Sequence, residues 1–300
     1  MLKSKLNFAA IDIGSNAVRL LIKGINPGEG VNDLTKSLLI RVPLRLGEDS
    51  FGAGAISPDK EKRLKRTIKS FKLLMKVFNV VAYRACATSA MRDAKNGMAI
   101  ANKIRQKMGI NIEVIDGNEE ARIVYESHIG DLLDREGCYI YVDVGGGSTE
   151  ISLICDGALM HSRSYNIGTV RALSGKVKDS EWDALKRDMD TLSTQYNQIQ
   201  IIGSGGNINK LYRMSHSKVE NLLSVDRLQE LHDALAPLSY EQRMEQFHLN
   251  PDRADVIIPA SEIFLTVAHH IGANSIFVPT IGIIDGITHG LCAEYLQRIQ

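Results

Sequence analysis

Two short segments of the sequence combine an aspartate with a run of small residues. The segment IDIGSNA places Asp12 just before Gly14, Ser15 and Asn16, and VDVGGGST places Asp143 just before three glycines. Small residues let backbone N–H groups approach an anion without obstruction by side chains. A single turn of this composition is more often structural, but two copies at equivalent places predict a pair of phosphate-binding loops.

The second loop offers more hydrogen-bond donors than the first. Its candidate phosphate-binding residues are Gly145, Gly146, Gly147, Ser148 and Thr149, of which the last two add hydroxyl groups. In a chain of two domains, the two loops would face each other across the interdomain cleft. We therefore expect them to hold a chain of phosphates from both sides.

Three carboxylates are candidate ligands of Mg²⁺. Asp12 and Asp143 end apolar strands, where an unpaired charge is costly, so each needs a partner. Glu150 lies seven residues past Asp143, and a hairpin would bring the two to the same end of the sheet. Mg²⁺ prefers carboxylate and phosphate oxygens and retains several waters. For Glu150 alone, a solvent-facing strand residue is the competing interpretation.

Further charged residues stand at the ends of predicted elements. Arg84 lies within a strand and Arg92 just after it, where the ligand crevice of an α/β sheet is usually found, although a surface salt bridge explains either arginine equally well. Glu119 and Glu120 occupy the first turn of a predicted helix, where the helix dipole favours carboxylates. The glycine-rich segment 203–207 could be a third anion loop or a tight turn.

The elements that position these residues occur twice. A strand, a turn and two further strands are predicted over residues 6–46, and the same pattern returns over 138–165, with Asp12 and Asp143 131 residues apart. Helices are expected over 58–78, 95–108, 118–133 and 180–195, the first with Ser57 and Pro58 at its start. Alternating helices and strands after each opening indicate a duplicated α/β fold. We expect two domains, 1–125 and 126–300.

Composition restricts the class of protein. Of the 300 residues, 44% are hydrophobic and 24% charged, a mixture typical of globular chains and atypical of disordered ones. No run of apolar residues is long enough to predict a membrane-spanning helix, and the N-terminal segment does not resemble a signal peptide, so we expect a cytoplasmic protein. The four cysteines, Cys86, Cys138, Cys155 and Cys292, are predicted to be small core residues.

Charge is distributed unevenly along the chain. Residues 1–125 contain 22 Lys and Arg against 12 Asp and Glu, whereas residues 126–300 contain 14 against 23. Between Lys60 and Lys76 the predicted helix carries eight basic residues and one acid, Glu61. A solvated helix face is one interpretation, attraction of a polyanion is another, and an anionic membrane surface or nucleic acid is a third.

Seven segments, in order, resemble the exopolyphosphatase/guanosine pentaphosphatase (Ppx/GppA) family. They are AAIDIGSNAVRLLI, ATSAMRDAKN, IDGNEEARIVYES, YVDVGGGSTEIS, IGTVRAL, IGSGGNINKL and TIGIIDGI. The resemblance implies two duplicated actin-like (ribonuclease H-like) domains, each a mixed sheet flanked by helices. It also implies hydrolysis of a terminal phosphoanhydride bond in polyphosphate or guanosine pentaphosphate, with Mg²⁺ as cofactor.

The resemblance assigns roles to individual residues. Glu120 corresponds to the family's catalytic base, Asp143 and Glu150 to its magnesium-linked carboxylates, and Arg92 to a phosphate contact. Arg19 occupies a position where pentaphosphate-hydrolysing members often have arginine, so we count it among the phosphate-binding residues.

Two other functions remain open at this point. A non-catalytic sensor of alarmone or polyphosphate would need the loops without the catalytic carboxylates. An ATP-dependent kinase of the same superfamily would use residues 203–207 for adenosine phosphates. Beyond the polyphosphate or guanosine pentaphosphate substrate we expect no membrane and no nucleic acid partner, and a homodimer is possible.

Overall fold

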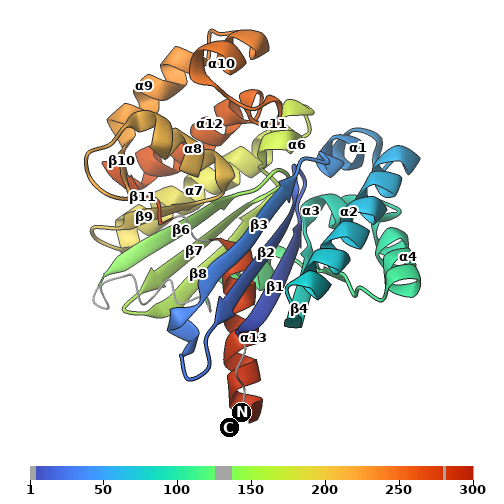
Figure 1. Cartoon of the computed structure of the whole chain (residues 1–300). Helices are drawn as coiled ribbons and strands as arrows, with labels where there is room; N and C mark the ends of the chain where they lie inside the picture. The colour runs from blue at the N-terminus through green and yellow to red at the C-terminus, as the bar shows by residue number, and fades with distance from the viewer. Residues whose placement is uncertain (1–4, 126–136, 280–281, 300) are drawn as a thin grey trace. The chain divides into compact units, whose positions relative to one another are not determined.

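The chain divides into two compact units (Figure 1). The computed structural model describes residues 5–125, 137–279 and 282–299. Of these, residues 5–125 and 283–299 form the first unit, and residues 137–279 with Gly282 form the second.

The first unit contains a five-stranded mixed sheet in the order β3-β2-β1-β4-β5. Its strands are β1 (Leu6–Ile13), β2 (Val18–Ile25), β3 (Thr35–Val42), β4 (Val80–Ala87) and β5 (Glu113–Val114). Its helices are the 3₁₀ turn Val31–Asp33, α1 (Leu46–Ala53), α2 (Pro58–Val77), α3 (Ser89–Asp93), α4 (Gly97–Met108), α5 (Gly117–Tyr125) and α13 (Ile283–Ile299). β1 pairs antiparallel with β2 on one side and parallel with β4 on the other.

The second unit contains a six-stranded mixed sheet in the order β10-β11-β9-β6-β7-β8. Its strands are β6 (Cys138–Val144), β7 (Thr149–Cys155), β8 (Ala158–Tyr165), β9 (Gln200–Ser204), β10 (Leu222–Ser224) and β11 (Ser275–Phe277). Its helices are α6 (Thr169–Leu173), α7 (Asp179–Gln195), α8 (Gly206–Ser215), α9 (Val225–Leu235), α10 (Tyr240–Phe247), α11 (Pro251–Ala254) and α12 (Ile257–Ile271). β6 pairs antiparallel with β7 and parallel with β9.

The two sheets repeat one topology. Each opens with a three-stranded antiparallel meander, and a later strand joins the free side of the first strand in parallel. Asp12 and Asp143 are each the second-last residue of that first strand. The predicted fold class, a duplicated actin-like α/β fold with mixed sheets flanked by helices, is confirmed.

The C-terminal helix α13 packs on the first unit. The ring of Tyr295 meets that of Phe8 edge-on, with centroids 5.6 Å apart, and Cys292 is buried in an apolar cluster with Leu6 and Phe8. Lys23 Nζ and Asp285 Oδ1 are 2.6 Å apart. We expected residues 283–299 to belong to the second domain, 126–300, but they belong to the first unit. The apolar face of a helix does not indicate which distant sheet the helix covers.

Local sequence signals predicted the bounds of most elements to within a few residues. α2 begins as expected, with Pro58 at its start and the Ser57 hydroxyl accepting from the Lys60 amide at 3.4 Å. The strand expected over 36–46 ends earlier, at Val42, because Pro43 cannot donate to a ladder, and residues from Leu46 form α1 instead. The expected helix 118–133 begins at Gly117, and its portion after Tyr125 lies outside the described residues.

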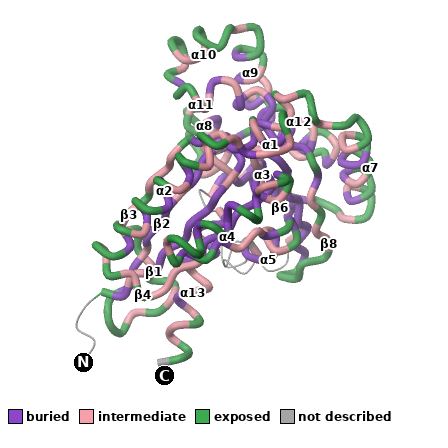
Figure 2. Tube along the Cα trace, turned by 90° about the vertical axis from the view of Figure 1, so that its right-hand side faces the viewer, coloured by how far each residue is buried: buried purple, intermediate pink, exposed green. Residues whose placement is uncertain are grey.

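The core of the second unit surrounds α12, most of whose residues are buried (Figure 2). Within the described part of the chain, the segment Pro251–Ile271 alone is long and apolar enough to cross a membrane, and 67% of its apolar window is buried. We expected no such segment from the sequence. Its apolar character comes from its position in the core.

The prediction for the cysteines is wrong for one pair. Cys138 and Cys155 stand directly opposite each other in the β6–β7 ladder and form a disulfide with a Cα–Cα distance of 4.2 Å. They are 17 residues apart in the chain, and the intervening hairpin brings them together. Cys86 and Cys292 are buried free thiols, as expected.

We expect the purified protein to contain two alkylatable thiols when denatured without reductant and four after reduction. Closing a loop of this length constrains the unfolded chain by about 3 kcal/mol, so reduction should lower the free energy of unfolding by a similar amount. Urea titration with and without reductant measures this. A Cys138→Ser variant is the control, because its stability should not respond to reductant. Four reactive thiols before reduction would contradict the pairing.

Candidate functional site

The first phosphate-loop candidate, between β1 and β2, is held by the start of α1. The amide of Gly14 closes the turn on the Ala17 carbonyl at 3.1 Å. Further along the chain, the Arg45 amide donates to the Asn16 carbonyl at 2.9 Å and the Gly47 amide to the Ser15 carbonyl at 2.8 Å. The carbonyl groups of the turn are therefore hydrogen-bonded to the segment at the start of α1.

Ser15 connects this loop to a second segment of the sheet. Its side chain is buried, and its Oγ lies 3.0 Å from Ser89 Oγ at the start of α3. The sequence predicted Ser15 as a phosphate donor. In the structure its hydroxyl fixes the loop to α3, the helix that also carries Arg92.

The second candidate loop, between β6 and β7, is held in the same way by α6. The Thr169 amide donates to the Gly145 carbonyl at 3.1 Å, and the Val170 amide donates to the Gly146 carbonyl at 2.8 Å. The side chain of Arg171 adds a third contact, from Nε to the Gly147 carbonyl at 2.6 Å. The carbonyls of this turn thus also face the protein.

The opposite side of the second loop carries available donors. Within the residues that the structure describes, the amides of Gly146, Gly147 and Ser148 donate to no other residue. The hydroxyl of Thr149 is already used, since it donates to the Ile167 carbonyl at 2.6 Å. Successive amides on one side of a turn form a concavity suited to an anion. The donors of this loop are therefore backbone groups of its glycines and Ser148.

Gly168, to which the sequence analysis gave no role, lies directly against the second loop. A Cβ atom there would lie 2.4 Å from the backbone N and C atoms of Gly147. Only glycine permits this approach. The segment IGTVRAL carried part of the family resemblance, but no signal within it showed what the glycine contacts.

The two duplicated aspartates face residues of opposite charge type across their hairpins, a cation in one and an anion in the other. Asp12 pairs with Arg19 in the β1–β2 register, and Arg19 Nη1 donates to Asp12 Oδ2 at 3.2 Å. Asp143 pairs with Glu150 in the β6–β7 register. Burial raises the pKa of Asp12, and the Arg19 guanidinium opposes that shift. The first pair is an internal ion pair, whereas the second places two carboxylates side by side.

The Asp143–Glu150 pair has the donor chemistry that a hard cation needs. Directly opposite residues in an antiparallel pair have Cβ atoms about 5 Å apart. Glu150 is buried, with an exposed fraction of 5%. Ser164 Oγ donates to one oxygen of Glu150 at 2.9 Å. Among the described residues no group of three or more His, Cys, Asp or Glu could hold a metal, so a cation here would take its remaining ligands from substrate and water.

Glu120 and Arg92 lie together in the first unit. Arg92 Nη1 donates to Glu120 Oε1 at 3.2 Å and to the Ile115 carbonyl at 2.8 Å. The side chain of Glu120 is 12% exposed and that of Arg92 is 27% exposed. The structure therefore brings together the predicted base and the predicted phosphate contact.

The neighbouring Glu119 belongs to a separate ion-pair network. Its carboxylate accepts from Arg84 Nη2 at 2.8 Å and from Arg122 Nε at 2.8 Å. Hydrogen bonds from Arg122 and Arg84, acting against partial burial, lower the pKa of Glu119 to about 2. Arg84 also binds Glu113. Arg84 and Glu119 thus stabilise the start of α5.

The third candidate loop, residues 203–207, is filled by the protein itself. A Cβ at Gly206 would lie 2.3 Å from Arg253 Nη2, and Arg253 Nη1 donates to Asn207 Oδ1 at 2.7 Å. The arginine therefore occupies the space in front of the start of α8. This arrangement favours the tight-turn interpretation.

Comparison with known proteins gives a consistent result. The model of the Ppx/GppA phosphatase family matches residues 34–294. Exopolyphosphatase 2 of Mycobacterium tuberculosis is 26% identical, over 94% of this chain and 98% of that protein. A guanosine-5'-triphosphate,3'-diphosphate pyrophosphatase of Aliivibrio fischeri is 24% identical over 96% of this chain, which spans 59% of that protein. The crystal structure of the Aquifex aeolicus member of the family superimposes with a TM-score of 0.75 at 26% identity, over 99% of this chain and 100% of that one.

Gly168→Ala should displace the second loop and lower turnover about 100-fold, since misplacing a positioning group by about 1 Å has an effect of that size. The added methyl would clash with the Gly147 backbone, which cannot move aside freely. Gly290→Ala in α13 is the matched control, because a Cβ there meets nothing within 4 Å. Measuring kcat for phosphate release tests this; equal kcat values for both variants would contradict the role of Gly168.

Proposed function

Because the chain belongs to the Ppx/GppA phosphatase family, we propose that it hydrolyses the terminal phosphoanhydride bond of polyphosphate or guanosine pentaphosphate. Water attacks the terminal phosphorus, the bond to the bridging oxygen breaks, and orthophosphate leaves the shortened substrate. The observation that carries the proposal is the pairing of Glu120 with Arg92, which combines a mostly buried carboxylate with a guanidinium at one point of the first unit.

Glu120 would accept the proton of the attacking water. A positioned carboxylate within reach of the water is what general-base catalysis requires. Arg92 holds one oxygen of Glu120 through Nη1, which fixes the direction of the carboxylate. A guanidinium has five N–H donors, so the remaining donors of Arg92 can bind the terminal phosphate.

The second loop would stabilise the charge of the reacting phosphate. Phosphoryl transfer spreads negative charge over the equatorial oxygens, and most of the catalysis comes from positioning and electrostatic stabilisation. The amides of Gly146, Gly147 and Ser148 are preorganised for this because α6 holds the other side of the turn. Arg19, 30% exposed beyond its bond to Asp12, would add a cationic contact in the first unit.

Asp143 and Glu150 are the residues that would hold Mg²⁺. Bound there, the cation would neutralise charge on the phosphate oxygens and orient them. Asp12 fits this role less well than the sequence suggested, since Arg19 already balances its charge. We therefore assign Asp12 to positioning Arg19.

A substrate panel tests the proposal as a whole. Purified protein is incubated with medium-chain polyphosphate, guanosine pentaphosphate and ATP, each with Mg²⁺, and free phosphate is followed. We expect release from polyphosphate or guanosine pentaphosphate and little from ATP. Tight binding of both substrates without phosphate release would instead identify a sensor, and activity confined to ATP would contradict the proposal.

Glu120→Gln should lower kcat by about 10²–10⁴-fold while substrate still binds, because the amide is nearly isosteric but cannot accept a proton. Single-turnover kinetics and equilibrium binding separate the two effects. Glu119→Gln is the matched neighbour: its carboxylate is bound to Arg84 and Arg122, so this variant should lose stability but retain most turnover. Near-normal phosphate release by Glu120→Gln would refute the assignment of the base.

Asp143→Asn should raise the Mg²⁺ concentration needed for half-maximal activity at least tenfold, since Mg²⁺ has few protein ligands to lose. Asp12→Asn is its counterpart in the duplicated unit and should change the Mg²⁺ requirement little, because Asp12 is bound to Arg19. Magnesium titrations of both variants, at saturating substrate, provide the comparison. The opposite ranking, or full activity of the unmodified protein in excess chelator, would contradict the assignment.

A further inference from the structure

We propose that a basic groove along α2 binds the distal part of a linear polyphosphate chain while its end is hydrolysed elsewhere. This inference rests on the proposed function and adds a substrate subsite to it. We define the α2 groove by Lys62, Arg66, Lys69, Lys72 and Lys76, which line two hollows beside α2. The family resemblance assigned no role to any of these residues.

Basic side chains on α2 outnumber their acidic partners. Lys60 binds Glu48 and Asp49 at 2.8 and 2.9 Å, and Lys65 binds Glu61. The other basic residues of α2 have no ion pair among the described residues. Lys62, Arg63, Arg66, Lys69 and Lys76 are exposed, and Lys72 donates to the Met108 carbonyl. Like charges at this spacing on a helix repel one another, and in the described part of the chain no ion pair of these residues offsets that cost.

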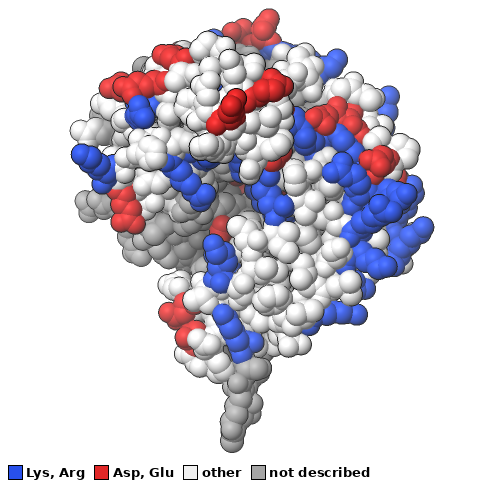
Figure 3. Space-filling view, turned by 45° about the horizontal axis from the view of Figure 1, so that its top comes forward, with Lys and Arg blue, Asp and Glu red and all other residues white. Residues whose placement is uncertain are grey.

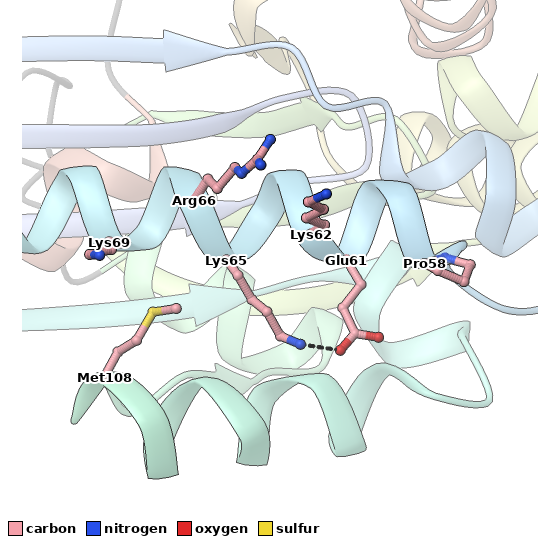
Figure 4. A pocket seen from close by; sticks show the side chains of 7 residues that line it. All are labelled: Pro58, Glu61, Lys62, Lys65, Arg66, Lys69 and Met108. Atoms are coloured by element: carbon pink, nitrogen blue, oxygen red, sulfur yellow. Dashed lines mark hydrogen bonds and ion pairs between the residues drawn. The ribbon is translucent and has the colours of Figure 1, made fainter.

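The unpaired cations border real hollows. The first, of about 360 Å³, lies beside α2 and is lined by Lys62, Arg66 and Lys69 together with Met108 of α4. Figure 4 shows Lys65 and Glu61 reaching from α2 toward α4, joined to each other, while Arg66 extends from the other flank of the helix. The second hollow, of about 410 Å³, is lined by Lys72, Lys76 and Tyr83. Charge and shape therefore coincide.

The surface is extended rather than compact. From Lys62 to Lys76 the helix rises about 21 Å, at about 1.5 Å per residue. On α4 the exposed Lys103, Arg105 and Lys107 continue the basic surface, and Figure 3 shows Lys and Arg gathered at the right of the view, over these two helices. A ligand that neutralises this row must be a long polyanion, because a short phosphate compound reaches only one or two of its charges.

Polyphosphate fits the row better than nucleic acid does. Proteins that bind single-stranded nucleic acid add aromatic platforms on which the bases stack. No aromatic residue lines the first hollow, and the hydroxyl of Tyr83 in the second donates to the Gly109 carbonyl at 3.2 Å. A row of ammonium and guanidinium groups without stacking surfaces matches a chain that carries charge on every repeat and has no bases.

The test is a triple variant, Lys62→Gln, Arg66→Gln and Lys69→Gln. These side chains lack ion pairs, so their loss should leave the fold intact; Lys65 and Lys72 are avoided because they bind Glu61 and the Met108 carbonyl. The matched control replaces Lys186, Arg187 and Lys218, exposed residues of the second unit, with glutamine. Both variants remove two lysines and one arginine.

For long-chain polyphosphate we expect KM to rise about fivefold or more in the triple variant, with kcat unchanged and a flatter dependence of kcat/KM on salt. The control should match the unmodified protein. For tripolyphosphate and guanosine pentaphosphate all three proteins should behave alike, because the α2 groove is proposed to bind only the distal part of a long chain.

Three results would overturn the inference. The first is an equal loss for long and short substrates, and the second is no loss for either. The third is that a single-stranded RNA oligonucleotide or anionic lipid vesicles lose binding in the triple variant while long-chain hydrolysis is unchanged. Failure of the proposed function would look different, since the unmodified protein would then release no phosphate from any of these substrates.

Discussion

The carboxylate near the end of the first strand of each sheet is the constraint on which the rest of the site depends. Asp12 is buried, so its charge must be balanced by a nearby positive charge. In the first unit the balance is internal, because Arg19 stands opposite Asp12. In the second unit Glu150 stands opposite Asp143, and we propose that a bound cation contributes to the balance there. On this proposal, one duplicated hairpin would supply two kinds of chemistry.

The turn that follows each carboxylate depends on a second duplicated feature. A helix that begins after the meander donates amides to the carbonyls of the turn: α1 to the first loop and α6 to the second. Because the carbonyls of the second loop are held by α6, its amides point away from α6 and are fixed in position. Electrostatic stabilisation of a phosphate requires donors fixed in this way. Gly168 is needed for this approach because any side chain there would meet the Gly147 backbone. The proposed phosphate loop therefore depends on two segments of the chain.

Local features of the sequence were sufficient to predict most of the elements and the duplication. Alternation, turn residues and the Ser57 cap predicted the meanders and α2, and the seven-residue spacing predicted that Asp143 and Glu150 lie at the same end of the sheet. The same spacing separates Asp12 from Arg19 and could have predicted their ion pair. Contacts made by distant segments could not be predicted in this way. These contacts depend on which apolar faces pack together, and the amphipathic pattern of a helix does not indicate its partner. They include the packing of α13 on the first sheet, the hydrogen bonds from the starts of α1 and α6 to the two loops, and the position of Arg253.

The central claim, that the duplicated carboxylates have diverged into an internal ion pair and a cation site, can be tested in one crystal. The Glu120→Gln variant would be crystallised with polyphosphate and Mn²⁺ in place of Mg²⁺, and anomalous scattering recorded at the manganese edge. The account predicts a manganese peak beside Asp143 and Glu150, with Asp12 still bound to Arg19. A peak beside Asp12 with Arg19 displaced, and none beside Asp143, would contradict it.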